Sequence, residues 1–254
     1  MAQIEMNALS VITCGSFSAR IFLPEMNKLA LDDAGHVKKY PVLWLLHDEG
    51  GAALDWLSTP AERLAAKYGI FIIAPDQHHA MCTNMDYGPR YEKFMATELP
   101  GICRNNLPIS SDPKDNWVGG VGTGGYGAVK MALKHPDVFS KAVSIHGILD
   151  MEALCKKAQN GEDTGTYQNL ASLEAVFGDL NKFAGSENDL YALSESKAKA
   201  NFLFINEKEC PRIAEAQRLC EKLSDKAEQL LLEKDMEFDS YQTSLPKAVQ
   251  WLTK

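Results

Sequence analysis

Two short, continuous apolar runs constrain the fold of this chain more than any other feature of its sequence. They are Tyr40–His47 and Ile70–Pro75, and neither shows the alternation expected of a strand with one solvated face. Runs of this length and composition are typical of strands buried on both faces. Because helix-like stretches alternate with strand-like runs along most of the chain, we predict a mostly parallel central sheet with helices on both faces.

The same patterns predict the remaining elements. Further strands are expected at Asn116–Gly120, Lys141–Ile145, Asn201–Asn206 and Gln229–Leu232, and helices at Tyr91–Cys103, Gly124–Lys134, Pro211–Lys222 and Leu245–Leu252. Another helix should run from Pro60 to Tyr68, with Thr59 as its N-cap. Ala8–Leu23 offers two strand-like runs around residues 14–16, which predicts an N-terminal antiparallel hairpin at one edge of the sheet.

The length of the chain favours one large domain. We predict a single α/β domain over residues 1–254, because a chain of this size can bury one large core. The region 159–198 is rich in Gly, Asn, Asp and Ser and contains one helix-like piece at Leu173–Phe177. We interpret this region as a cap-like insertion over the sheet edge.

Charge and composition exclude several classes of partner. The formal net charge is −8 and the pI is about 5.3, with scattered basic residues, which disfavours nucleic acid and membrane surfaces. Met1–Leu9 has neither the pattern of a signal peptide nor that of a membrane span, so we expect a cytoplasmic location. No residue spacing calls for a metal or another cofactor. The widely spaced cysteines are expected to be free thiols: Cys14, Cys82, Cys103, Cys155, Cys210 and Cys220.

A glycine-rich turn between a predicted strand and a predicted helix carries the most specific motif. Gly120, Gly122 and Gly124 have the spacing of G-x-S-x-G, a strained turn that lifts a nucleophilic serine above the strand end. Gly122 stands at the position of that serine. The segment 122–127 also fits G-x-G-x-x-G, but the following strand ends at His146 without the acidic residue that a dinucleotide site needs, so we disfavour that alternative.

The sequence resembles the esterase D group of α/β-hydrolases, which includes tributyrin esterases and S-formylglutathione hydrolases. The resemblance rests on YPVLWLLHDEGG from Tyr40, on YGPRYEKFMATELP from Tyr87, on the glycine-rich turn and on ALKHPDVFSKAVSIHGILD from Ala132. It covers roughly residues 40–150. It implies an α/β-hydrolase fold and hydrolysis of small acyl esters or thioesters by a Ser-Asp-His triad.

Each triad position implied by the resemblance is altered in this chain. The nucleophile corresponds to Gly122, which has no side chain. The acid corresponds to the loop after the strand at 201–206, where Glu209 is the candidate, and the base corresponds to Met236. Because no histidine follows His146, a shift of the alignment by a few residues does not restore the base.

The loop after the first apolar run departs from the family as well. The family has His-Gly and a small loop that supplies one oxyanion-hole N–H group, whereas this chain has His47, Asp48 and Glu49. Two carboxylates there would oppose a developing oxyanion. The backbone N–H group of Thr123 is the other expected donor, and we expect its side chain to point away from the nucleophile position.

Other residues at the same edge admit a structural and a functional interpretation. We interpret His47 as a structural histidine bonded to loop backbone. His146 follows a strand at the edge where open α/β sheets bind ligands, yet it also fits a structural imidazole. A dyad of Cys82 with His78 or His79 is conceivable, although a solvated loop with an uninvolved thiol fits the spacing better.

Two functions from different classes remain open. The first is a non-catalytic esterase relative that keeps the scaffold and serves as a binding or scaffold protein, with a small acyl compound as its ligand and a homo-oligomer as its assembly. The second is an acyl-ester or thioester hydrolase whose catalytic residues have moved, for example to Cys82 or His146. We favour the first, because both the serine and the histidine of the triad are missing.

Overall fold

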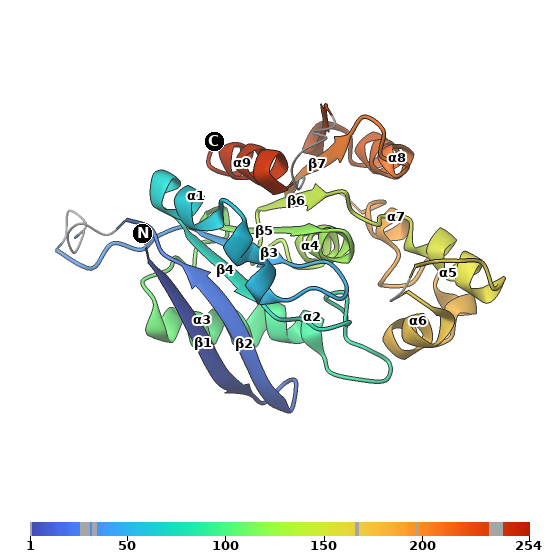
Figure 1. The fold of residues 1–254 in the computed structure, drawn as a ribbon, viewed down its shortest axis with the longest axis horizontal. Helices are drawn as coiled ribbons and strands as arrows, with labels where there is room; N and C mark the ends of the chain where they lie inside the picture. Colours follow the sequence, from blue (N-terminus) through green and yellow to red (C-terminus); the bar gives the residue numbers. More distant parts are fainter. Residues whose placement is uncertain (1, 26–30, 32–34, 166–167, 197, 234–240) are drawn as a thin grey trace.

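The computed structural model describes residues 2–25, 31, 35–165, 168–196, 198–233 and 241–254. Within these residues, eight strands form one sheet in the order β1-β2-β4-β3-β5-β6-β7-β8 (Figure 1). The strands are β1 (Gln3–Ser10), β2 (Gly15–Phe22), β3 (Val42–Leu46), β4 (Phe71–Pro75), β5 (Asn116–Val121), β6 (Lys141–Ile145), β7 (Asn201–Glu207) and β8 (Ala227–Leu232). All neighbours from β4 to β8 pair in parallel, which confirms the predicted sheet.

The N-terminal hairpin lies at one edge, as predicted. β1 pairs antiparallel with β2, and β2 pairs antiparallel with β4. The hairpin starts at Gln3, five residues before the predicted start, because the pairing of Gln3 with Phe22 extends the ladder. The carboxylate of Glu98 accepts hydrogen bonds from the N–H groups of Val11 and Ile12, which fastens the hairpin turn to the helical layer.

Helices cover both faces of the sheet. On one face, α1 (Ala61–Tyr68) and α9 (Tyr241–Leu252) pack on Leu43 and Leu45 of β3. On the other face lie α3 (Leu99–Asn106), α4 (Thr123–Lys134), α5 (Met151–Gln159) and α8 (Ile213–Leu223), packed in the core that contains Trp44. Among the described residues, none of the helices combines the length and apolar character that crossing a membrane requires.

Two helix predictions need correction. The helix predicted from Pro60 starts at Ala61, with Pro60 as the cap residue, although the Thr59 hydroxyl still accepts a hydrogen bond from the Ala61 N–H group. The helix predicted at Tyr91–Cys103 is divided into α2 (Tyr91–Lys93), a π-turn at Phe94–Glu98 and α3. Pro100 lies in the first turn of α3 and has no N–H group, so regular α-helical bonding cannot continue through it.

The region 159–198 contains α6 (Leu170–Phe177) and the short α7 (Leu190–Leu193). Leu173, Phe183 and Leu190 are buried in the same core as α4, so this region packs beside that helix (Figure 1). The helix-like piece predicted at Leu173–Phe177 is confirmed and begins three residues earlier, where the Asn169 side chain caps the Ser172 N–H group. The single domain over 1–254 remains a prediction.

The order of the strands creates a crevice at one edge of the sheet. β3 lies between β4 and β5, so the chain passes from one side of β3 to the other between them. Leu46 at the end of β3 is paired with Gly120 near the end of β5. The loop after β3 and the turn after β5 therefore meet at the carboxyl edge, where open α/β sheets bind ligands.

Candidate functional site

The turn between β5 and α4 keeps the geometry of a nucleophile elbow. Gly122 has φ +54° and ψ −117°, a strained conformation for any residue with a side chain. The flanking glycines permit a close approach of the strand and the helix. A Cβ atom on Gly120 would lie 2.4 Å from the backbone of Gly124, and one on Gly124 would lie 2.4 Å from the His47 carbonyl oxygen.

The carboxylate of Asp48 lies directly beside this elbow. Its Oδ1 atom accepts hydrogen bonds from the backbone N–H groups of Glu49 and Thr123, both at 2.8 Å. The Thr123 hydroxyl donates to the same oxygen at 3.1 Å. In an intact site of this geometry, the N–H group after the nucleophile and one from the loop after β3 form the oxyanion hole. In this chain, the N–H group of Thr123 and that of Glu49, in the loop after β3, both donate to the Asp48 carboxylate.

Asp48 also occupies the space that a side chain at position 122 would need. A Cβ atom built on Gly122 would lie 2.1 Å from Oδ1 and 2.3 Å from Oδ2 of Asp48. Real Cβ atoms do not approach other atoms so closely, so position 122 can carry a side chain only if Asp48 moves. The glycine at position 122 and the carboxylate of Asp48 therefore depend on each other in packing.

The sequence suggested that the side chain of Thr123 points away from the nucleophile position, and the structure shows that this expectation is wrong. Its hydroxyl reaches the Asp48 carboxylate, which lies where the nucleophile would be. The expectation assumed an empty oxyanion hole. Once a carboxylate fills the hole, the hydroxyl gains an acceptor within reach.

Glu49 contributes its backbone, while its side chain lies elsewhere. The carboxyl group is 1% exposed and lies 3.7 Å from Nδ1 of His79. Burial raises the pKa of Glu49 to about 7, and neither oxygen of its carboxyl group has a hydrogen-bond partner among the described residues. Of the two carboxylates predicted beside the oxyanion site, only Asp48 is placed in it.

A cavity of about 400 Å³ opens at this edge of the sheet. Its described lining brings together Asp48, Gly122, His146 and Glu209, four of the residues predicted from the sequence, and adds Glu207 and Arg212. Thr123 and Glu49 are not among the described lining residues, and each donates a backbone hydrogen bond to Asp48. The base position, Met236, lies outside the described residues. No group of three or more His, Cys, Asp or Glu side chains in the described part of the chain is arranged to hold a metal ion.

His146 lies at the wall of this cavity in a left-handed backbone conformation, with φ +49°. Its carbonyl oxygen accepts a hydrogen bond from Arg212 at 3.1 Å, and its Nε2 lies 4.0 Å from Oε1 of Glu207. Burial lowers the pKa of His146, and the charge of Arg212 acts in the same direction against that of Glu207. Among the described residues, the ring forms no hydrogen bond with a hydroxyl or thiol, so His146 activates no visible nucleophile.

The interpretation of His47 as a structural histidine is confirmed. Its Nε2 accepts a hydrogen bond from the Gln77 N–H group at 3.0 Å, so Nδ1 carries the proton and donates to the Asp48 carbonyl oxygen at 2.7 Å. Burial lowers the pKa of His47, which keeps the ring neutral. This ring therefore fixes the backbone from which the Asp48 side chain projects.

Cys82 is unsuited to nucleophilic chemistry. Its side chain is fully buried in the core, against Gly127 of α4. Burial raises the pKa of the Cys82 thiol to about 12, which leaves almost no thiolate at neutral pH. The conceivable dyad with His78 or His79 receives no support from this environment.

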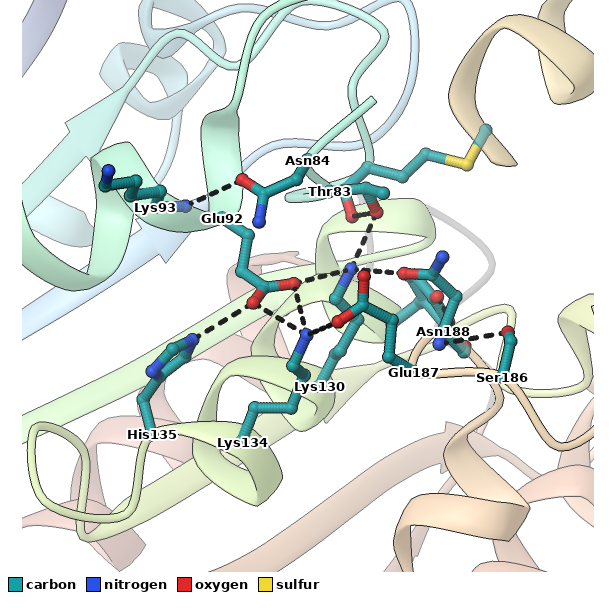
Figure 2. A network of polar contacts seen from close by, with 12 residues as sticks. Thr83, Asn84, Glu92, Lys93, Lys130, Lys134, His135, Ser186, Glu187 and Asn188 are labelled. Atoms are coloured by element: carbon teal, nitrogen blue, oxygen red, sulfur yellow. Dashed lines mark hydrogen bonds and ion pairs between the residues drawn. The ribbon is translucent and has the colours of Figure 1, made fainter. Parts of the chain in front are cut away.

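A buried ionic network beside α4 was not predicted from the sequence (Figure 2). Lys130 is fully buried, and its ammonium group donates to Thr83 and Asn188, both at 2.8 Å, and lies 3.2 Å from Glu92. All three of its protons therefore have acceptors. The sequence signal was a lysine within the apolar stretch from Ala128 to Ala132, which an amphipathic helix would not bury without a partner.

Glu92 is the centre of that network. Its carboxylate contacts Lys130, Lys134 and His135, at 3.2, 2.8 and 3.2 Å. Burial alone would raise the pKa of Glu92, but the hydrogen bond with His135 and the charges of the two lysines outweigh it and lower the pKa to about 2. The network fixes α4, which begins at the elbow, to α2 and to the loop before α7 (Figure 2).

Comparisons with known proteins agree with this fold. The family described as "Putative esterase" matches residues 17–211. An acetyl esterase of Caldicellulosiruptor saccharolyticus is 26% identical over 59% of this chain and 57% of its own length. An S-formylglutathione hydrolase of Bos taurus is 29% identical over 48% of this chain and 52% of its own length. The chain thus spans little more than half the length of these curated relatives.

Solved structures share the fold over the whole chain. A substrate-bound fluorophosphonate-binding serine hydrolase F of Staphylococcus aureus superposes with a TM-score of 0.85 at 24% identity, covering 100% of this chain and 98% of the other. An S-formylglutathione hydrolase of the same organism gives 0.81 at 24% identity, covering 100% and 99%. At this level of identity the likeness establishes the fold, and function has to be argued from the site.

The packing conflict between position 122 and Asp48 predicts a measurable coupling. We expect Gly122→Ala to destabilise the natural protein by about 1–3 kcal/mol more than it destabilises the Asp48→Gly variant. In that variant, position 48 has no carboxylate to clash with the new Cβ atom at position 122. Backbone strain at φ +54° is present in both backgrounds and cancels. Denaturant unfolding of the four proteins measures the difference.

Gly119→Ala serves as the matched control for that cycle. Its added Cβ atom would lie 3.4 Å from Leu43 and meets no part of Asp48, so we expect equal effects in both backgrounds. If Gly122→Ala lowers the free energy of unfolding equally in the natural protein and in the Asp48→Gly variant, Asp48 does not occupy the space beside position 122.

The ionic network predicts a pH-dependent loss of stability. We expect Glu92→Gln to lower the free energy of unfolding by about 2–4 kcal/mol at pH 7, because Lys130 loses its buried counter-charge. The pKa of Glu92 is about 2 in the folded protein and 4.5 ordinarily, so its stabilisation is complete above pH 4.5 and is lost as the pH falls toward 2. Unfolding curves at pH 7 and pH 3 should therefore show that Glu92→Gln is less stable than the natural protein by a smaller margin at pH 3.

Glu187→Gln provides the comparison for this experiment. Glu187 also pairs with Lys134, but its side chain is 66% exposed, so we expect a change within about 0.5 kcal/mol. A deficit for Glu92→Gln as small as that of Glu187→Gln would contradict the structural importance of the network.

Proposed function

We propose that this chain, which belongs to the esterase family of α/β-hydrolases, does not hydrolyse esters and instead uses its cavity to bind a small ligand. The observation that carries the proposal is the Asp48 carboxylate, bound to the Glu49 and Thr123 N–H groups beside Gly122. A binding or scaffold role is what remains when the fold is retained and the reactive groups are lost. The position that the resemblance gives to the nucleophile holds Gly122, and the position that it gives to the base holds Met236.

Electrostatics oppose catalysis at this position even if a nucleophile were supplied. Acyl transfer from an ester places a negative charge on the former carbonyl oxygen, and the oxyanion hole must stabilise it. Here, the donors already hold a carboxylate. A second unit charge 4 Å away would be repelled by about 4 kcal/mol at an effective dielectric constant of about 20, in addition to the lost hydrogen bonds.

The alternative is an acyl-ester or thioester hydrolase with relocated catalytic residues. The matched acetyl esterase and S-formylglutathione hydrolase favour this chemical class. Against it stand the buried, protonated thiol of Cys82 and the absence of a hydroxyl or thiol partner for the His146 ring among the described residues. A cytoplasmic location and a homo-oligomeric assembly remain predictions from the sequence.

The proposal predicts negligible hydrolysis of short-chain p-nitrophenyl esters by the purified protein. The reason is the lack of a hydroxyl at position 122 and of a histidine after residue 146. Initial rates over a range of p-nitrophenyl acetate concentrations measure this. Turnover in the ordinary enzyme range, about 1–1000 per second, would favour the hydrolase alternative.

Labelling with a fluorophosphonate probe gives a second, independent measurement. The probe reacts with activated serines, and we expect no stoichiometric adduct in the intact mass spectrum. Modification of any serine at one equivalent would identify a relocated nucleophile, and peptide mapping would place it.

Replacement of the missing serine should not restore activity. We expect Gly122→Ser alone to be inactive toward p-nitrophenyl acetate, because the new side chain collides with Asp48 and its hydroxyl has no base. The matched variant is Asp48→Gly with Gly122→Ser, which opens the space and frees both N–H donors. It should exceed the single variant while staying far below ordinary turnover, and high activity of Gly122→Ser alone would show that a base, most simply His146, is within reach.

A further inference from the structure

The two oxygen atoms of the Asp48 carboxylate differ in their hydrogen bonding: Oδ1 is hydrogen-bonded within the chain, and Oδ2 is open, meaning that it accepts no hydrogen bond from the described residues. Oδ1 accepts three hydrogen bonds, from two N–H groups and one hydroxyl. Oδ2 accepts none from the described residues and is not among the buried atoms that lack a partner, so it remains accessible at the cavity wall. The bonds to Oδ1 fix the direction in which Oδ2 faces, which makes it a preorganised acceptor.

The rest of the cavity wall is acidic as well. Glu207 and Glu209 contribute two further carboxylates, and Arg212 is the sole cationic side chain of the described lining. One N–H group of Arg212 is already bound to the His146 carbonyl oxygen. Because burial lowers the pKa of His146, its ring adds no positive charge at neutral pH.

A second cavity of about 280 Å³ shares Asp48 and Tyr241 with the first. It adds the carboxylate of Asp55 and the neutral ring of His47, and its described lining contains no cationic side chain. Asp48 therefore lies between two hollows whose combined described walls carry four carboxylates and one guanidinium group.

We propose that the cavity beside Gly122 takes a small ligand with a cationic amine, whose ammonium group donates to the open Oδ2 of Asp48. This inference rests on the proposed non-catalytic function, because it assigns a ligand class to the same site. An esterase site needs positive potential where an oxyanion develops, whereas this site offers a fixed negative charge. An ammonium-carboxylate hydrogen bond is stronger than the hydrogen bond of a neutral donor.

The same charges select against other ligands. A small carboxylate, such as the acid product of ester hydrolysis, would meet Asp48 and Glu207 and would find the oxyanion donors already bound. A neutral ester has no N–H donor for Oδ2. Cavities of this volume hold small molecules, so an amine with a short apolar chain fits the site.

The test compares three probes that each contain a butyl or butanoyl chain: n-butylammonium chloride, sodium butyrate and ethyl butyrate. Each is titrated into the ¹⁵N-labelled protein, and Kd is obtained from the amide shifts of Gly122 and Thr123. We expect n-butylammonium to bind at least tenfold more tightly than the other two. Its affinity should fall when NaCl is raised from 20 to about 300 mM, since the attraction is electrostatic.

Asp48→Asn is the decisive variant because it keeps the shape of the side chain. Its amide oxygen can still accept from Glu49 and Thr123, while an NH₂ group replaces the open oxygen. We expect at least a tenfold loss of n-butylammonium affinity, and a smaller loss for Glu207→Gln. Asp225→Asn, at the opposite edge of the sheet and outside both cavities, should leave the affinity unchanged.

The possible results separate this inference from the proposed function. Equal binding of butyrate or ethyl butyrate, unchanged amine binding by folded Asp48→Asn, or no binding of n-butylammonium would overturn the amine site. None of these results would make the protein an esterase. Turnover of ethyl butyrate during the titration, seen as ethanol and butyrate signals, would instead overturn the non-catalytic proposal.

Discussion

The structure of this site depends on one interaction, the acceptance of two backbone N–H groups by the Asp48 carboxylate. An oxyanion hole is a pair of donors that point at empty space until a reaction supplies an oxygen. Buried donors without acceptors are costly, and in an active enzyme water or substrate fills the place. Here, the Asp48 side chain accepts both N–H groups, so the two donors are satisfied within the chain itself.

This interaction links two positions that lie 74 residues apart in the sequence, Asp48 and Gly122. Asp48 can enter the hole because Gly122 carries no side chain, and Gly122 is kept free of one because Asp48 lies within 2.3 Å of where it would be. The parallel register of β3 and β5 brings the two together, since Leu46 pairs with Gly120. His47 supports the arrangement by donating to the Asp48 carbonyl oxygen. A side chain at position 122 alone would therefore clash with Asp48, and removal of the Asp48 carboxylate alone would leave the Glu49 and Thr123 N–H groups without this acceptor.

The sequence predicted what depends on short-range patterns. The buried strands, the hairpin, the α4 helix and the elbow all follow from apolar runs and from glycines at fixed spacing. It did not predict that the hydroxyl of Thr123 and the carboxylate of Asp48 meet, because that contact depends on strand register and on side-chain direction. The Lys130–Glu92 pair was missed for the same reason, as its partners come from separate elements. Met236, assigned as the lost base, lies outside the described residues.

The glycines of the elbow show why such motifs report geometry more reliably than chemistry. Gly120 and Gly124 are required because a Cβ atom on either would strike backbone at 2.4 Å, whether or not a nucleophile stands between them. The packing of α4 on the sheet, which the Lys130 network stabilises, imposes that requirement independently of any chemistry at position 122. Reactive side chains are under no such constraint. The glycines of the motif therefore report the fold, whereas the chemistry of the site depends on the side chains around them, here the carboxylate of Asp48.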